Sequence, residues 1–274
     1  MKQQIESLFQ TKPEQYQPSD RSLISDFLAA LNTGSIRACE KPGEDWIVNT
    51  WVKMGILCAF RMGKLTQFDW GGKKPFFDKD TLPERQFSLQ DQVRIVPGGT
   101  SARNGCFLAP NVAVMPPAFI NVGAYVDSGS LIDSHALVGS CAQIGRNVHL
   151  SAGAMIGGVL EPIGLRPVIV EDDVFIGGNS GIYEGILIRS RAVIASGVVI
   201  TSSTPVFDAV NGAFLPSGED TPLIIPPGAV VVSGSRRLRT NPDFQIYCPI
   251  IIKYRDAKTD HSVRLERAIR ELTD

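Results

Sequence analysis

The chain has 274 residues, of which 43% are hydrophobic and 20% charged, and its formal net charge is −1. A charge this close to zero gives no electrostatic basis for binding nucleic acid or an anionic membrane, so we expect neither as a partner. No apolar run is long enough to span a bilayer, and the N-terminus lacks the apolar core of a secretory signal. The five scattered cysteines include no Cys-x-x-Cys pair, and we interpret them as reduced thiols of a cytoplasmic protein.

Residues 1–95 carry no repeat, but two segments within them have helical patterns. Apolar residues recur at helical spacing within residues 20–31 and again within residues 49–60. We therefore predict a small, mainly helical N-terminal domain that covers the open end of the structure that follows. Residues 71–85 are rich in charge, proline and aromatic side chains and predict an exposed connection.

A repeat of six residues runs through the middle of the chain. An aliphatic residue occupies every sixth position over residues 108–156 and again over residues 170–200, and a small or β-branched residue follows four positions later. The period slips across residues 157–167 and returns briefly after residue 222. The repeated aliphatic residues are Leu108, Val114, Ile120, Val126, Ile132, Val138, Ile144, Leu150, Ile156, Val170, Ile176, Ile182, Ile188, Ile194, Ile200, Ile225 and Val231.

A period of six fits neither a helix nor a long alternating strand, but it fits a three-sided prism with six residues per side. One aliphatic side chain per side points to the axis, and the small residue fits the narrow corner. A β-sandwich of short strands is the alternative, and it does not explain the fixed phase. We predict a mainly β fold, a hexapeptide-repeat parallel β-helix over residues 96–235.

Two further segments complete the predicted organisation. Residues 205–222 interrupt the repeat as a polar excursion loop, which in a regular solenoid is usually functional or mobile. Residues 236–274 predict a short C-terminal cap, with a β-rich run at 245–254 and a helix at 261–272.

Candidate chemical groups lie beside the axial residues, where side chains face outward. Asp127 and Asp133 each follow an axial residue, although a carboxylate in such a place is commonly solvated or bonded to its own turn. His135 and His149 are the histidines of the repeat, and we interpret both as structural rather than as a base. With three histidines in the chain, one of them far along the tail, we expect no metal site.

Several strings within and after the repeat are more specific than the period itself. They resemble the tetrahydrodipicolinate N-succinyltransferases, a family of hexapeptide-repeat acyltransferases, over most of the chain from about residue 31 onward. The strings are Asn121-Val122-Gly123-Ala124-Tyr125-Val126-Asp127, Val138-Gly139-Ser140-Cys141-Ala142-Gln143-Ile144-Gly145, Asn147-Val148-His149-Leu150-Ser151, Gly157-Gly158-Val159-Leu160-Glu161-Pro162, Tyr183-Glu184-Gly185, Val230-Val231-Val232-Ser233-Gly234 and Asp256-Ala257-Lys258-Thr259.

The resemblance implies a left-handed coil and a cytoplasmic homotrimer with active sites between subunits. It also implies succinyl-CoA as co-substrate, with no tightly bound cofactor. The implied reaction transfers the succinyl group to the amino group of the opened form of tetrahydrodipicolinate, giving N-succinyl-2-amino-6-oxopimelate for lysine and diaminopimelate biosynthesis. The amine would attack the thioester directly.

The same resemblance assigns roles to individual residues. Arg94 and Asp133 match the arginine and aspartate that hold the dicarboxylate substrate in the family, and Asp133 would also orient the attacking amine. Many members of the family carry a glutamate where this chain has Gly181. Glu184, three residues later, is the second acidic residue that we assign to catalysis, and its equivalence to that glutamate is not established by the sequence.

The CoA thioester is expected along the cleft between chains, with the loop at residues 205–222 folding over it. Basic side chains near the C-terminus are candidates for its phosphates, and they are equally explained as solvated surface charge. The expected CoA-binding residues are Ala195, Ser196, Gly197, Ser233, Gly234, Arg236, Lys253 and Lys258, with Arg237 as a further candidate.

Three alternatives remain open at this stage. An acetyl-CoA-dependent enzyme acting on the same acceptor is the nearest. Another hexapeptide acyltransferase, acting on a sugar-nucleotide amine or a serine hydroxyl, is the second. The third is a non-catalytic β-helix that serves as a scaffold or binds acyl-CoA.

Overall fold

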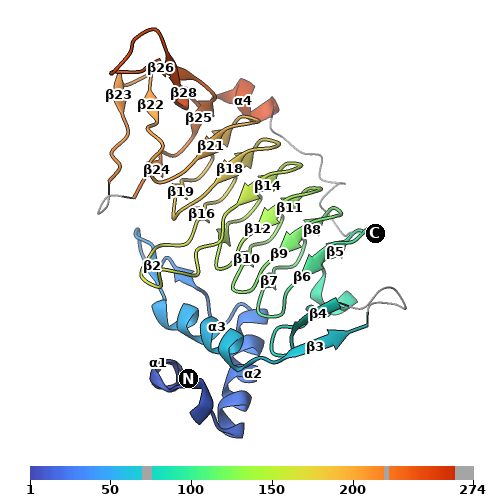
Figure 1. Cartoon of the computed structure of the whole chain (residues 1–274). Coiled ribbons are helices and arrows are strands. Elements are labelled where there is room, and N and C mark those ends of the chain that lie inside the picture. Colours follow the sequence, from blue (N-terminus) through green and yellow to red (C-terminus); the bar gives the residue numbers. More distant parts are fainter. Residues whose placement is uncertain (70–75, 219–221, 263–274) are drawn as a thin grey trace.

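The computed structural model describes residues 1–69, 76–218 and 222–262, and its main body is a three-sided parallel β-helix (Figure 1). Each coil of the chain contributes one short strand to each side. Strands of one side pair in parallel, so that Leu131 lies beside both Ala113 and His149. Successive coils therefore stack at the strand spacing of about 4.8 Å.

Three ladders of strands make up the sides, which we number in the order in which the chain reaches them. Side 1 contains β5 (Arg94–Ile95), β8 (Ala113–Val114), β11 (Leu131–Ile132), β14 (His149–Leu150), β17 (Phe175–Ile176), β20 (Val193–Ile194) and β25 (Ala229–Val232). Side 2 contains β6 (Ser101–Ala102), β9 (Phe119–Ile120), β12 (Leu137–Val138), β15 (Met155–Ile156), β18 (Gly181–Ile182) and β21 (Val199–Ile200). Side 3 contains β7 (Phe107–Leu108), β10 (Tyr125–Val126), β13 (Gln143–Ile144), β16 (Ile169–Val170), β19 (Leu187–Ile188) and β24 (Ile224–Ile225).

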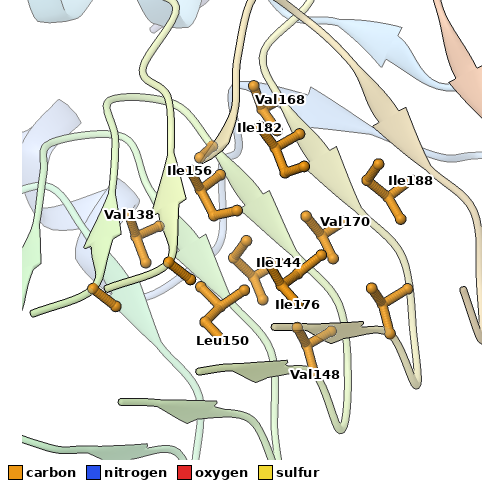
Figure 2. Close-up of a cluster of buried hydrophobic side chains, with 14 of the residues drawn as sticks. Val138, Ile144, Val148, Leu150, Ile156, Val168, Val170, Ile176, Ile182 and Ile188 are labelled. Atoms are coloured by element: carbon orange, nitrogen blue, oxygen red, sulfur yellow. The ribbon is translucent and has the colours of Figure 1, made fainter. Parts of the chain in front are cut away.

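The second residue of most of these short strands points to the axis, and corner residues such as Val148 and Val168 complete the core (Figure 2). Ile132, Ile144 and Ile156 are completely buried, as are nearly all the other repeated aliphatic residues. Two serines take the place of the small apolar residue at the corner, and Ser130 satisfies its buried hydroxyl by donating to the carbonyl of Gly145 at 2.8 Å. The predicted period and prism are confirmed, and the β-sandwich alternative is excluded.

The N-terminal region is helical, as predicted. Its helices are α1 (Lys2–Gln10), α2 (Pro18–Asn32) and α3 (Thr50–Met62), with short 3₁₀ turns at Pro13–Gln15 and Leu89–Asp91. The sequence predicted α2 and α3 but not α1. In the described parts of the chain, no helix combines the length and apolar character that crossing a bilayer requires.

These helices pack along the corner between sides 2 and 3 rather than over the open end, which corrects the sequence prediction. Val122 and Cys141, from two successive turns of that corner, belong to the same buried cluster as the helices. Gly123 has a left-handed φ of +76°, and a Cβ there would lie 2.8 Å from Cδ1 of Ile56 in α3. The small corner residues thus let the helices approach the prism closely.

The open end is covered instead by the segment that leads into β5. The backbone N–H of Arg85 donates to the carbonyl of Ala102 in the first coil at 2.7 Å, and Phe87 packs against the axial core. Backbone pairing of this kind satisfies groups that a helix face leaves without partners.

The connection predicted to be exposed at residues 71–85 is exposed at Phe76 and Phe77, but its described part also forms a strand and contributes to the core. β4 (Phe76–Lys79) pairs antiparallel with β3 (Leu65–Phe68), and Leu82 is buried with 1% of its surface exposed. Thr81 ties the segment to α3 by donating to the carbonyl of Ala59 at 2.7 Å.

The second interruption of the repeat forms a hairpin rather than a polar loop. β22 (Phe207–Asp208) pairs antiparallel with β23 (Ala213–Phe214) and parallel with β28 (Ile250–Tyr254) of the tail. Asp208 is buried and accepts hydrogen bonds from the Tyr254 hydroxyl and the Asn211 amide, each at 2.7 Å. Asp208 is the one charged residue of the hairpin, and its hydrogen bond from Tyr254 fixes the hairpin to the tail.

The tail covers the far end of the prism, as predicted. β28 pairs antiparallel with β25, and β26 (Ser235–Arg237) pairs with β27 (Gln245–Tyr247). The Tyr247 hydroxyl accepts a hydrogen bond at 2.8 Å from the backbone N–H of Val199 in the last strand of side 2. Helix α4 spans Ala257–Ser262, and most of the helix predicted at residues 261–272 lies outside the described residues.

A second anchor joins the N-terminal region to the prism through a buried carboxylate. Glu171 lies just after β16, and it accepts hydrogen bonds from Lys41 at 2.8 Å and from the indole of Trp46 at 2.9 Å. Arg189 pairs with the same carboxylate at 3.1 Å, and the backbone N–H of Ser190 donates to it at 3.0 Å. Lys41 and Trp46 are the first and last residues of the loop that connects β1 (Cys39–Glu40) to β2 (Ile47–Val48).

Candidate active site

The turns that join side 1 to side 2 stack on one another and form one edge of the prism, which we call edge 1–2. The backbone N–H of Gly153 donates to the carbonyl of Ser134 at 2.8 Å, and that of Gly197 donates to the carbonyl of Gly178 at 2.9 Å. Residues in these turns are therefore held in a continuous ladder. The turns comprise residues 133–135, 151–153, 177–179 and 195–197.

Asp133 begins the turn of edge 1–2 that follows β11. One of its carboxylate oxygens accepts a hydrogen bond from the N–H of Ser134 at 2.7 Å, and no described residue donates to the other oxygen. Asp127, the other outward aspartate, lies on the corner between sides 3 and 1, where Arg146 approaches it at 3.6 Å. The Asp133 carboxylate is thus oriented by its own turn and half-exposed, which suits a group that meets a ligand.

Arg94 is the first residue of β5 on side 1, and its register fixes its distance from Asp133. It pairs with Ala113, which in turn pairs with Leu131, two residues before Asp133. Two strand spacings, about 10 Å, therefore separate the two residues along the prism axis. An extended dicarboxylate is long enough to reach both.

Glu184 lies on a different corner. It follows β18 in the turn from side 2 to side 3, and its carboxylate accepts hydrogen bonds from the hydroxyl of Ser202 at 2.6 Å and from the N–H of the same residue at 3.0 Å. Within one chain, the structure does not bring Glu184 to edge 1–2. Its assignment to catalysis stays a prediction.

The residues expected to bind the CoA arm fall on two adjacent turns of edge 1–2. Ala195, Ser196 and Gly197 form one of them, and Ser233 on the next coil donates to the carbonyl of Gly197 at 3.4 Å. Gly197 has a left-handed φ of +76°, and open space surrounds the position where its Cβ would lie. The structure therefore places Ser233 and Gly234 next to this turn, on the same edge as Asp133.

The basic candidates do not form one group. Arg236 lies in β26 and Arg237 follows it in the same strand. Lys253 lies in β28 and pairs with Asp256 at 3.0 Å, while Lys258 is exposed on α4. Their assignment to CoA phosphates stays a prediction.

The two histidines of the repeat occupy different surroundings. His135 lies in edge 1–2 with a left-handed φ of 62°, and its N–H donates to the carbonyl of Pro117 at 2.5 Å. His149 faces outward on side 1, where its ring meets Phe175 edge-on at a centroid distance of 5.0 Å. Both environments fit the structural interpretation made from the sequence.

One residue whose side chain reaches from the next corner back towards edge 1–2 was not singled out by sequence reasoning. The Tyr183 ring lies over the outward faces of Gly157 and Gly181, so that a Cβ at Gly181 would be 2.4 Å from the ring. The sequence signal that could have found Tyr183 is the glycine at position 181, where the neighbouring strand of side 2 carries the larger Met155.

The chain is similar to known proteins over nearly its whole length. Residues 1–62 match the family model described as tetrahydrodipicolinate N-succinyltransferase N-terminal, and residues 167–202 match the hexapeptide repeat of succinyl-transferase. A Cupriavidus necator protein named 2,3,4,5-tetrahydropyridine-2,6-dicarboxylate N-succinyltransferase is 42% identical over 258 residues, covering 92% of this chain and 90% of the relative. A Sodalis glossinidius protein of the same name is 37% identical over 280 residues, covering 99% of this chain and 98% of the relative.

Proposed function

The chain belongs to the tetrahydrodipicolinate N-succinyltransferase family of CoA-dependent acyltransferases, and we propose that it transfers succinyl from succinyl-CoA to opened tetrahydrodipicolinate. The product of this transfer is N-succinyl-2-amino-6-oxopimelate. The observation that carries the proposal is the identity of 42% across 92% of the chain, which spans both the helical region and the prism.

In the proposed reaction, Asp133 accepts a hydrogen bond from the acceptor amine and directs its lone pair to the thioester carbon. The nitrogen–carbon bond forms, the carbonyl becomes an oxyanion, and the carbon–sulfur bond then breaks. CoA leaves as a thiolate that takes up the proton released by the amine. An α-amine has a pKa of about 8, so a modest base is enough to remove its ammonium proton near neutral pH.

The remaining contacts of the proposal follow edge 1–2. Arg94 binds a carboxylate of the acceptor through its two-pronged guanidinium, about 10 Å along the axis from the Asp133 level. The turn at Ala195–Gly197 and the neighbouring Ser233–Gly234 hold the pantetheine arm, because open space surrounds the Cβ position of Gly197. This order places the acceptor at one end of the edge and CoA at the other.

We also propose that the protein is a cytoplasmic homotrimer with active sites between subunits. Exposed apolar residues on side 2 support a second copy as its neighbour: Phe119 is 38% exposed and Val199 is 42% exposed. Sedimentation of the purified chain tests this assembly, since a monomer at micromolar concentration would contradict it.

The proposed reaction is tested by identifying its product. Purified protein is incubated with tetrahydrodipicolinate and succinyl-CoA, and the product is analysed by mass spectrometry and NMR. We expect an amide between succinate and the 2-amino group. Acetyl-CoA in a parallel reaction distinguishes the acetyltransferase alternative, and a binding protein that only holds acyl-CoA would form neither product.

Replacing Arg94 with alanine is expected to raise the KM for the acceptor by about ten- to a hundredfold, because a charged hydrogen bond contributes about 1.5–3 kcal/mol. Arg94→Lys should recover only part of the loss, since an ammonium lacks the two-pronged donor geometry. Steady-state kinetics at saturating succinyl-CoA measures both. Arg146→Ala, which removes an exposed arginine paired with Asp127, is the control. Equal effects of the two alanine variants would contradict the assignment.

A further inference from the structure

Tyr183 lies flat on side 2 because two glycines leave room for its ring. A Cβ at Gly181 would lie 2.4 Å from ring atom Cε2 and 2.8 Å from the hydroxyl oxygen of Tyr183. A Cβ at Gly157, which directly follows the neighbouring strand β15, would lie 2.7 Å from Cδ1 of the same ring. Any larger residue at either position would push the tyrosine off the surface of the prism.

The backbone itself does not require glycine at these two places. Neither Gly157 nor Gly181 has a φ in the left-handed region, in contrast to the glycines of several turns. At the position that Gly181 occupies, other strands of side 2 carry Phe119, Leu137 and Met155. The physical requirement that remains is the space taken by the Tyr183 ring.

The direction of the ring sends the hydroxyl towards edge 1–2. The turn at residues 177–179 leads into β18, so Gly181 is nearer to edge 1–2 than Tyr183 is. Because the Tyr183 hydroxyl lies beside Gly181, the side chain reaches back from its own position to the start of the strand. The residue is half-buried, and no described residue is hydrogen-bonded to the hydroxyl.

The level of this hydroxyl along the prism lies between the two parts of the proposed site. Gly181 pairs with Met155, which pairs with Leu137 in the coil of Asp133, so two strand spacings, about 10 Å, separate these levels. On the other side, β18 pairs with β21, which directly follows the proposed CoA turn at residues 195–197. A thioester that extends from the CoA turn towards Asp133 passes the level of the Tyr183 hydroxyl.

We propose that the Tyr183 hydroxyl donates a hydrogen bond to the thioester carbonyl oxygen of the bound acyl-CoA, which makes Tyr183 a catalytic residue. The assignment rests on the proposed N-acyl transfer. The hydrogen bond strengthens as the amine attacks and negative charge develops on the oxygen. A phenol is suited to this role because its hydroxyl is an uncharged hydrogen-bond donor.

Tyr183→Phe is expected to lower kcat by about a hundredfold, the usual effect of removing one oxyanion donor, with less than a threefold change in the KM for succinyl-CoA. The phenylalanine ring occupies the same space next to Gly157 and Gly181, so we expect the fold to be retained. Tyr16→Phe, which makes the same chemical change in the helical region, is the matched control and should leave kcat unchanged.

Gly181→Ala provides a second, independent variant. Its Cβ displaces the ring while the tyrosine hydroxyl is kept, so kcat should fall although no polar group has been removed. Gly43→Ala is its matched control, because no atom lies within 4 Å of the added Cβ there. Circular dichroism and thermal unfolding of all four variants confirm that the fold is intact.

A spectroscopic measurement separates this inference from the proposed function. The infrared carbonyl band of succinyl-CoA labelled with ¹³C at the thioester carbon should shift to lower wavenumber on binding to the wild type, and Tyr183→Phe should reverse most of that shift. If the wild type catalyses succinyl transfer, the role of Tyr183 is tested by kcat, and a kcat of Tyr183→Phe within twofold of the wild-type value overturns that role. If the wild type binds the thioester but does not acylate tetrahydrodipicolinate, the proposed function fails. The infrared carbonyl band then tests whether Tyr183 donates to the thioester. Absence of thioester binding overturns both.

Discussion

Asp133→Ala is expected to lower kcat for succinyl transfer by about a hundred- to a thousandfold while leaving the thermal unfolding midpoint unchanged. Loss of a positioned acid–base group costs roughly 10²–10⁴ in rate, and a misdirected nucleophile alone costs about a hundredfold. The fold should tolerate the change because the carboxylate is half-exposed and its one hydrogen bond from a described residue is to the N–H of Ser134 in its own turn. Single-turnover measurement of CoA release at saturating substrates gives the rate of the chemical step.

Asp127→Ala is the matched control for this variant. Asp127 bonds the N–H of Ser128 at 2.7 Å just as Asp133 bonds that of Ser134, but it lies on another corner and faces Arg146. We expect its kcat to remain within about twofold of wild type, since it is remote from edge 1–2. Equal losses in the two variants would mean that the effect is structural, and would remove Asp133 from the site.

Glu171→Gln is expected to lower the free energy of unfolding by on the order of 3 kcal/mol, because it leaves Lys41 and Arg189 without their shared anion. Burial by itself raises the pKa of Glu171, but hydrogen bonds from Lys41, Trp46 and the N–H of Ser190 outweigh burial and hold that pKa at about 2. The Glu171 side chain is only 7% exposed, so solvent screens these interactions weakly.

The sign of the pH dependence follows from this lowered pKa. The unfolded chain binds a proton at Glu171 near pH 4.5 and the folded chain only near pH 2, so the stabilisation is fully present above about pH 4.5 and is lost as the pH falls towards 2. The free energy of unfolding of the wild type, measured with urea, should fall by about 1.4 kcal/mol per pH unit because of this group as the pH is lowered through that window. Glu171→Gln should remove that contribution. Glu44→Gln, at an exposed position, is the control. A Glu171→Gln variant whose free energy of unfolding depends on pH as steeply as that of the wild type would contradict the role of Glu171 as an anchor.

The prism was predictable because each of its contacts recurs. An axial residue such as Ile144 meets the same type of neighbour one coil above and one below, so the period alone identifies the buried position. Helices α2 and α3 were visible from their apolar stripes. Helix α1 was not, because only Ile5 and Leu8 of it are buried and they make too short a pattern.

Contacts between distant segments were not predictable from the sequence. Glu171 carries no local sign that Lys41 and Trp46 will reach it, and Asp208 in a polar stretch carries no sign that Tyr254 will bury it. The placement of the helices along a corner depends on the small residues at Gly105 and Gly123, which the period explains equally well as turns. Such pairings depend on the assembled fold rather than on local pattern.

The candidate site likewise contains residues that could be predicted from the sequence and residues that could not. Asp133 and the turn at Ala195–Gly197 were assigned by resemblance, and the six-residue period explains why both face outward on one edge. Glu184 was assigned by its nearness in sequence to Gly181, whereas the turn after β18 carries it to another corner. Tyr183 was missed because its proposed role depends on two glycines in neighbouring coils, a relation that only the stacking of coils reveals.

The most direct test of the account is the rate of thiol release by the purified wild-type protein given tetrahydrodipicolinate with either succinyl-CoA or acetyl-CoA, in parallel with Asp133→Ala. We predict rapid release that requires both the acceptor and succinyl-CoA and that falls at least a hundredfold in the variant. Release that prefers acetyl-CoA, or no acceptor-dependent release with either thioester, would contradict the proposed succinyl transfer.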